Sequence, residues 1–219
     1  MTEGALIVFD IDGTLFRTEL VTVPAVQQTF AAHGLPVPDV EKICSFFGRP
    51  NEEYLEWLAS MCSPERAQRI VNDTNRLELE LVATEGRLYD GARGVLETLR
   101  EDGYRLGVCS NGPEDYVDAF LDAHEVRTFF DAVRARCSKH TSKTEMLSEI
   151  IGVIGARYAV MIGDRHDDVL AAHANGALAI ATCYGFGADE ELEDADARVN
   201  VVTEIPEAVR GLLAQAKRS

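Results

Sequence analysis

Four short, uninterrupted apolar runs are spread widely along the chain. They span Leu6–Phe9, Leu106–Cys109, Ala159–Ile162 and Leu178–Thr182. None of them alternates polar with apolar positions, which is typical of strands buried on both faces, as in a parallel sheet. Helical patterns lie between the runs, for example at Val95–Leu99 and Met146–Ile154. This alternation of strand and helix predicts an α/β fold with a doubly wound parallel sheet.

The segment between the first two runs has a different pattern. From about Glu19 to Gly86 it contains no convincing strand, and instead three helical patterns follow one another at Val23–His33, Glu52–Met61 and Pro64–Thr84. A helical stretch of this length within an α/β chain predicts an inserted domain. We therefore expect an α/β core domain of residues 1–17 and 88–219, and a helical cap domain of residues 18–87.

Composition and charge narrow the classes of partner. The chain has 219 residues, of which 46% are apolar and 26% charged, as is ordinary for a soluble globular protein. Its net charge of −16 would repel nucleic acids and anionic membranes, so we expect neither as a partner. The five cysteines include no C-x-x-C pair, and no signal peptide or membrane span is visible. These features favour a cytoplasmic protein without disulfides.

Polar residues follow three of the predicted strands directly. The three segments are Asp10–Thr14, Ser110–Gly112 and Gly163–Asp168. In open parallel sheets, ligands bind beyond the carboxyl ends of the strands, and acidic turns scattered by chance would not all fall at that edge. Asp10 and Asp12 can both face one crevice, and Gly13 permits the tight turn that this needs. The pattern therefore indicates a functional site rich in carboxylates.

Taken in order, these motifs resemble those of a known family. The D-x-D-G-T sequence at Asp10–Thr14, a helical insert, Ser110, a lysine and the G-D-x-x-x-D sequence at Gly163–Asp168 cover nearly the whole chain. The chain resembles the haloacid dehalogenase superfamily of aspartyl phosphatases. It resembles in particular the phosphoglycolate phosphatase-like branch, which has a helical cap inserted after the first motif. The ordered set is specific, although each motif alone is not.

The resemblance implies a role for each carboxylate. Asp10 would be the nucleophile that forms an aspartyl phosphate, and Asp12 would be the general acid and then the general base. Mg²⁺ would be the cofactor, bound by Asp10, the backbone carbonyl of Asp12 and Asp164. Asp168, or its neighbour Asp167, would hold the water molecules of the metal.

Other residues would bind the phosphoryl group and the rest of the substrate. Thr14, Ser110 and Asn111 would contact the phosphoryl group, and Lys143 would offset the negative charges. Lys139 is the alternative to Lys143, because the Lys-Pro pair that is common in the family is absent here.

The insert offers one further candidate. Relatives place a specificity loop over the active site, and Phe46–Pro50 fits that position. Gly48 and Arg49 would then contact the substrate. The sequence fits equally well an ordinary loop between two helices with an arginine at the surface. Arg17 could reach the substrate, but pairing with acids of the insert is the favoured interpretation.

The function expected from these residues is Mg²⁺-dependent hydrolysis of a small phosphorylated metabolite, similar to phosphoglycolate. A 5'-nucleotidase, a pyrophosphatase and a sugar-phosphate mutase are alternatives. The mutase is disfavoured because Thr22 stands where mutase relatives usually have histidine. A dehalogenase is disfavoured because dehalogenase relatives lack the second aspartate, which is present here as Asp12. A binding module without activity is disfavoured because every catalytic position of the motifs is filled. The sequence predicts neither the substrate nor the oligomeric state.

Overall fold

The chain folds around a six-stranded parallel sheet, described here from a computed structural model covering residues 4–138 and 141–218. The strand order is β3-β2-β1-β4-β5-β6. The strands are β1 (Ala5–Phe9), β2 (Arg105–Ser110), β3 (Ala132–Ala135), β4 (Tyr158–Gly163), β5 (Leu178–Thr182) and β6 (Ala197–Val199). The four predicted strands correspond to β1, β2, β4 and β5, and the predicted α/β fold is confirmed.

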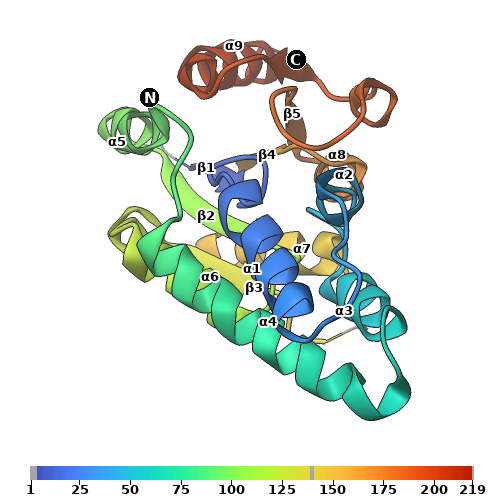
Figure 1. Cartoon of the computed structure of the whole chain (residues 1–219). Helices are drawn as coiled ribbons and strands as arrows, with labels where there is room; N and C mark the ends of the chain where they lie inside the picture. Colours follow the sequence, from blue (N-terminus) through green and yellow to red (C-terminus); the bar gives the residue numbers. More distant parts are fainter. Residues whose placement is uncertain (1–3, 139–140, 219) are drawn as a thin grey trace.

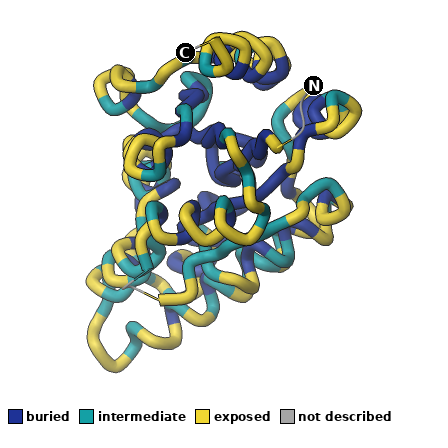
Figure 2. The backbone as a smooth tube through the Cα atoms, turned by 180° about the vertical axis from the view of Figure 1, so that it is seen from behind, coloured by how far each residue is buried: buried dark blue, intermediate teal, exposed yellow. Residues whose placement is uncertain are grey.

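Helices cover both faces of the sheet, which explains why the strands are apolar on both sides (Figure 1). One face packs against α5 (Ala92–Glu101), α6 (Glu114–Ala123) and α9 (Ile205–Ala216), and the other against α7 (Lys143–Ile154) and α8 (His166–Ala174). In β1, Ile7 and Phe9 point to the first face, while Leu6 and Val8 point to the second. Figure 2 shows this buried interior and the exposed outer sides of the helices.

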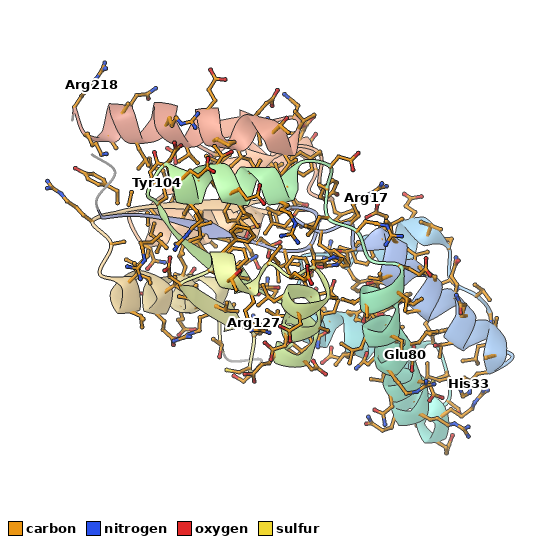
Figure 3. All side chains as sticks on the ribbon, turned by 90° about the vertical axis from the view of Figure 1, so that its left-hand side faces the viewer. Arg17, His33, Glu80, Tyr104, Arg127 and Arg218 are labelled. Carbon is orange, nitrogen blue, oxygen red and sulfur yellow. The ribbon has the colours of Figure 1, made fainter. Side chains whose placement is uncertain are left out.

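Four helices lie between β1 and α5 along the chain, and α5 then leads to the second strand of the sheet, β2. They are α1 (Glu19–Ala32), α2 (Val40–Cys44), α3 (Asn51–Ser60) and α4 (Pro64–Thr84). They enclose an apolar cluster of their own, which includes Phe30, Ile43 and Leu58. In Figure 3, His33, directly after α1, and Glu80 of α4 lie at one end of the molecule, and Tyr104 and Arg218 lie at the other.

The sequence analysis did not identify two of the strands, β3 and β6, or three of the helices, α2, α6 and α9. Strands β3 and β6 are short edge strands, and α2 is a helix of five residues. Three 3₁₀ helices, at Arg127–Phe129, Asp189–Leu192 and Val202–Glu204, complete the described elements. Within the described ranges, none of the helices combines the length and the apolar character that crossing a bilayer requires.

Candidate active site

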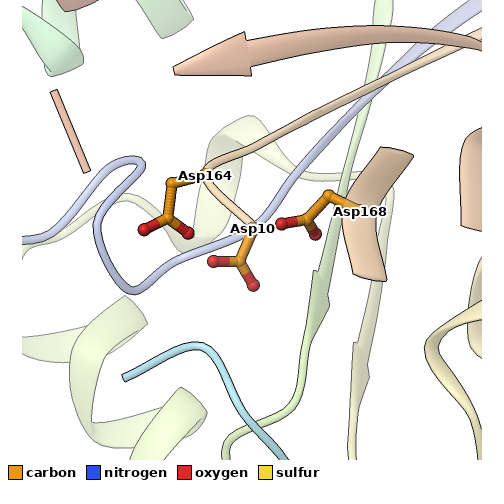
Figure 4. A group of neighbouring side chains, drawn as sticks. All are labelled: Asp10, Asp164 and Asp168. Atoms are coloured by element: carbon orange, nitrogen blue, oxygen red, sulfur yellow. The ribbon is translucent and has the colours of Figure 1, made fainter. Parts of the chain in front are cut away.

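Three aspartates meet at the carboxyl edge of the sheet, where β1 and β4 lie side by side. Asp10 directly follows β1, Asp164 directly follows β4, and Asp168 lies in the first turn of α8 (Figure 4). One carboxylate oxygen from each lies within 4.8 Å of the others, and all three residues are buried. Asp167 is only partly buried, and this cluster does not include it.

The close approach of these turns depends on their local sequence. Gly13 has a φ of +75°, and a Cβ at this position would lie 2.2 Å from Oδ2 of Asp164. No other residue type is accommodated there without a shift of the aspartate. The backbone N–H of Phe186 donates to Oδ2 of Asp164 at 2.6 Å, and that of Arg165 donates to Oδ2 of Asp168 at 3.0 Å. These bonds fix the orientation of both carboxylates.

Lys143 supplies the positive charge of the cluster. It is the first residue of α7, whose start is fixed by a capping box: Ser142 Oγ accepts from the N–H of Glu145, and the Glu145 carboxylate accepts from the N–H of Ser142. The Nζ of Lys143 lies 2.7 Å from Oδ1 of Asp10 and 2.6 Å from Oδ1 of Asp168. Lys139, the alternative from the sequence, lies outside the described residues.

The electrostatics of this cluster favour an additional cation. Burial raises the pKa of Asp10 well above its usual range, against the opposing effect of Lys143, and burial together with Asp168 raises the pKa of Asp164 to about 7. Burial alone would lower the pKa of Lys143, but Asp10 and Asp168 outweigh it and raise that pKa. One ammonium group therefore faces three carboxylates, and their charges are not balanced.

The unpaired oxygens of the cluster fit a hard divalent cation. Oδ2 of Asp10 and Oδ1 of Asp164 are buried and have no hydrogen-bond partner among the described residues. Buried carboxylate oxygens are costly without a partner, and Mg²⁺ prefers such oxygens as ligands. The residues present therefore suit Mg²⁺.

Asp12 lies beside the cluster in a different environment. Its Oδ1 accepts hydrogen bonds from Thr18 Oγ1 at 2.6 Å and from the Tyr116 hydroxyl at 2.7 Å. Burial raises the pKa of Asp12, and these two bonds oppose that shift. Because Oδ1 already accepts from two donors, Oδ2 is the oxygen that can carry a proton. The sequence analysis identified neither Thr18 nor Tyr116, which come from the start of α1 and from α6.

The polar residues at the carboxyl end of β2, of which Ser110 is the last strand residue, lie near the same edge. Ser110 is buried, and its Oγ accepts from the N–H of Gly112 at 3.0 Å. The side-chain amide of Asn111 donates to the carbonyl of Gly48 at 3.0 Å, so it joins β2 to the inserted helices. Thr14 is buried, and its Oγ1 has no hydrogen-bond partner among the described residues.

The Phe46–Pro50 loop of the insert reaches the core at Gly48. This residue has a φ of +73°, and a Cβ there would lie 2.5 Å from Cγ of Arg165. A second link joins Arg136 to Glu52, with Nε 3.1 Å from Oε2. Arg49 is 46% exposed, and its guanidinium lies 3.8 Å from the carboxylate of Glu53 in the first turn of α3.

Arg17 is also a surface residue. Its side chain is 47% exposed, and its Nε donates to Glu19 at 2.9 Å. Glu19 is the first residue of α1, so Arg17 pairs with an acid of the insert.

A cavity of about 60 Å³ opens beside Asp12, between the core and the insert. Its aromatic lining residues are Phe46, Phe47, Tyr54 and Tyr116. Its acidic lining residues are Asp12 and Glu78, and Thr22 Oγ1 donates to Glu78. Burial is the main cause that raises the pKa of Glu78 to about 7; the Thr22 bond opposes this shift, and the carboxylates of Asp12 and Asp115 add to it. The sequence analysis considered Thr22 only as a mutase marker and missed Glu78.

Comparison with known proteins agrees with this architecture. Residues 7–182 match the model of the haloacid dehalogenase-like hydrolase family. A phosphoglycolate phosphatase from Caulobacter vibrioides is 30% identical and aligns over 96% of this chain and 92% of its own. A 5'-nucleotidase from Pseudomonas aeruginosa is 29% identical, over 85% of this chain and 86% of its own.

Solved structures show the same fold. A predicted phosphatase from Clostridium acetobutylicum has a TM-score of 0.79 and 25% identity, over 94% of this chain and 98% of its own. A predicted phosphoglycolate phosphatase from Haemophilus somnus has a TM-score of 0.83 at 19% identity, over 93% of this chain and 97% of its own. The chain belongs to the haloacid dehalogenase-like hydrolase family, as its motifs predicted.

Proposed function

We propose that the chain is a Mg²⁺-dependent phosphomonoesterase that transfers the phosphoryl group to Asp10. The contact of one buried lysine with both Asp10 and Asp168, next to carboxylate oxygens without partners, carries this proposal. Such a site can neutralise a phosphoryl group in spite of the acidic net charge of the protein. Asp10, Asp164 and the backbone carbonyl of Asp12 would hold Mg²⁺, and Asp168 would orient Lys143 and the water molecules around the metal.

The first half of the reaction forms a bond between a carboxylate oxygen of Asp10 and phosphorus. The bond from phosphorus to the leaving oxygen breaks, and Asp12 gives that oxygen its proton, so that an alcohol departs. Lys143, Ser110 and backbone N–H groups near Asn111 would bind the phosphoryl oxygens. When bound, Mg²⁺ would reduce the repulsion between the carboxylates and the phosphoryl group.

The second half returns Asp10 to its carboxylate form. Asp12, now ionised, takes a proton from water while that water attacks phosphorus, and the bond from phosphorus to Asp10 breaks. Thr18 and Tyr116 keep Oδ1 of Asp12 fixed through both halves, because both donate to that oxygen. The same carboxyl group thus donates a proton and later accepts one.

The inserted helices would act as a cap over this chemistry, as the domain prediction of residues 18–87 implies. The contacts from Asn111 to Gly48 and from Arg136 to Glu52 support a closed arrangement. A closed cap would keep bulk water from the site until the alcohol has been protonated.

The size of the leaving group distinguishes two candidate functions. The relatives named phosphoglycolate phosphatase support a small phosphorylated metabolite, and the relative named 5'-nucleotidase supports a nucleoside monophosphate as the second candidate. The small volume of the cavity favours the first.

Release of inorganic phosphate from a panel of phosphomonoesters tests the proposal. The panel includes phosphoglycolate and nucleoside monophosphates, and each ester is assayed with Mg²⁺ and with EDTA. We expect phosphate release with Mg²⁺ alone, and none from the Asp10→Asn variant. Turnover that is equal in both metal conditions, or retained in the variant, would refute it.

A further inference from the structure

The cavity beside Asp12 has an acidic character that the phosphoryl chemistry does not require. Asp12 has a role as the proton donor, but Glu78 comes from α4 of the insert and contacts none of the cluster residues in any described hydrogen bond or ion pair. It is partly buried and accepts a hydrogen bond from Thr22. Keeping a carboxylate ionised at this depth is costly, and the single hydrogen bond from Thr22 offsets only part of that cost.

A buried hydroxyl lies at the same cavity. Tyr54 of α3 is 8% exposed, and its hydroxyl oxygen is buried without a hydrogen-bond partner among the described residues. Buried polar atoms in folded proteins nearly always have a partner. Tyr54 and Glu78 together therefore offer a phenol and a carboxylate to a polar group of a ligand in this cavity.

The charges around the cavity oppose an anionic ligand group. Asp12 and Asp115 set a negative field at Glu78. Among the described residues that line the cavity, the basic one is Arg49. Its side chain is half-exposed, and its guanidinium lies near the carboxylate of Glu53. A carboxylate in the leaving group would meet the carboxylate of Glu78 in a poorly solvated space, whereas Asp12 carries its proton at this stage of the reaction.

We infer that this cavity selects a leaving group that carries a hydrogen-bond donor and no negative charge, with Glu78 as the acceptor. The inference rests on the proposed phosphomonoesterase function and narrows its substrate class. The donor is a hydroxyl or an ammonium group, placed within a few atoms of the ester oxygen because the cavity is small. Phosphoglycolate, with its carboxylate, does not fit this description.

Two-carbon phosphate esters of similar size provide the test. They are 2-hydroxyethyl phosphate, phosphoethanolamine, phosphoglycolate and ethyl phosphate, which differ only in the group at the far carbon. We expect kcat/KM for the hydroxyl or the ammonium ester to exceed that for phosphoglycolate about tenfold or more, because hydrogen bonds to charged groups are strong. Of these two esters, the one with the higher kcat/KM identifies the donor. Ethyl phosphate carries neither a donor nor a charge, so comparison with it separates attraction of the donor from repulsion of the carboxylate.

Variants then assign the preference to Glu78. Glu78→Gln keeps the size of the side chain but removes its charge, so the ratio of the donor ester to phosphoglycolate should fall about tenfold. Glu80→Gln is the matched control, since Glu80 lies on the same helix, is exposed and pairs with Arg76 (Figure 3). It should keep the wild-type ratio.

Two results are decisive against the inference. A wild-type preference for phosphoglycolate overturns it, and loss of that preference in Arg49→Ala would assign specificity to Arg49. The inference is also overturned if Glu78→Gln leaves the ratio of kcat/KM for the donor ester to that for phosphoglycolate unchanged. If this variant fails to fold, the same ratio measured in the wild-type protein still tests the inference. No phosphate release from any ester would overturn the proposed function itself, which is a different outcome from a wrong order of substrates.

Discussion

Lys143→Met isolates the electrostatic contribution of the lysine at the centre of the site. Methionine keeps most of the side-chain volume but removes the ammonium that lies 2.7 Å from Asp10 and 2.6 Å from Asp168. All three side chains are at most 2% exposed, so water cannot replace the lost charge. Removing one partner of a buried ion pair costs about 3–5 kcal/mol. With a urea m-value of about 2 kcal/mol/M, the unfolding midpoint should fall by about 1.5–2.5 M.

The pH dependence of this loss has a definite sign. Without Lys143, the pKa values of the Asp10 and Asp164 carboxyls, which burial already raises, rise further above those of the unfolded chain. Their ionised forms then cost stability above the unfolded pKa, and this cost disappears as the pH falls and the carboxyls are protonated in both states. The deficit of the variant should therefore be larger at pH 7.5 than at pH 5.

Urea unfolding followed by circular dichroism, in EDTA, measures both effects. Lys139→Met, the sequence alternative, serves as the comparison and should leave the midpoint near that of the wild type. A Lys143→Met variant within about 1 kcal/mol of the wild type at pH 7.5 would contradict the account of a buried, charge-compensating lysine. A greater loss of activity in Lys139→Met would move the proposed role to that residue.

Three further predictions concern the metal, the proton donor and the cavity. EDTA should abolish phosphate release, Mg²⁺ should restore it, and Ca²⁺ should inhibit it, because Ca²⁺ accepts more ligands and can occupy both oxygens of Asp10; full activity in EDTA would exclude the metal site. Tyr116→Phe removes one hydrogen bond to Asp12 and should lower kcat about tenfold with little change in melting temperature; an unchanged kcat would show that this bond does not matter. Glu78→Gln should stabilise the protein by about 1–3 kcal/mol at pH 8 but hardly at pH 5. The folded pKa of Glu78, about 7, lies above its ordinary value, so the ionised side chain costs stability at any pH above that ordinary value. Equal unfolding midpoints of the variant and the wild type at pH 8 would contradict this.

The sequence predicted the parts of the fold that are governed by local composition. Strands such as β1 and β4 are buried on both faces, so their apolar runs are recognisable without any knowledge of neighbours. Strands β3 and β6 are short and lie at the sheet edges, and most of their residues are partly exposed. Edge strands of this kind lack the continuous apolar signal.

The same distinction applies to the candidate site. Asp10, Asp164 and Asp168 were predicted because each occurs in a motif that directly follows an apolar run, and the structure brings them together. The pairing of Asp12 with Tyr116 and that of Glu78 with Thr22 were missed because each joins two distant segments. Tyr116 lies 104 positions after Asp12, and Thr22 lies 56 positions before Glu78. A pattern along the chain does not contain pairings at such separations, which depend on tertiary packing.

Trapping of the covalent intermediate tests the central claim most directly. The protein is mixed with a substrate ester and Mg²⁺, quenched during turnover and treated with borohydride, which reduces an aspartyl phosphate to homoserine. Peptide mass spectrometry then locates the modified residue. The account predicts homoserine at position 10 in the wild-type protein, and none without substrate or in Asp10→Asn. Steady phosphate release with homoserine at another aspartate, or with none at all, would contradict the proposal that Asp10 is the nucleophile.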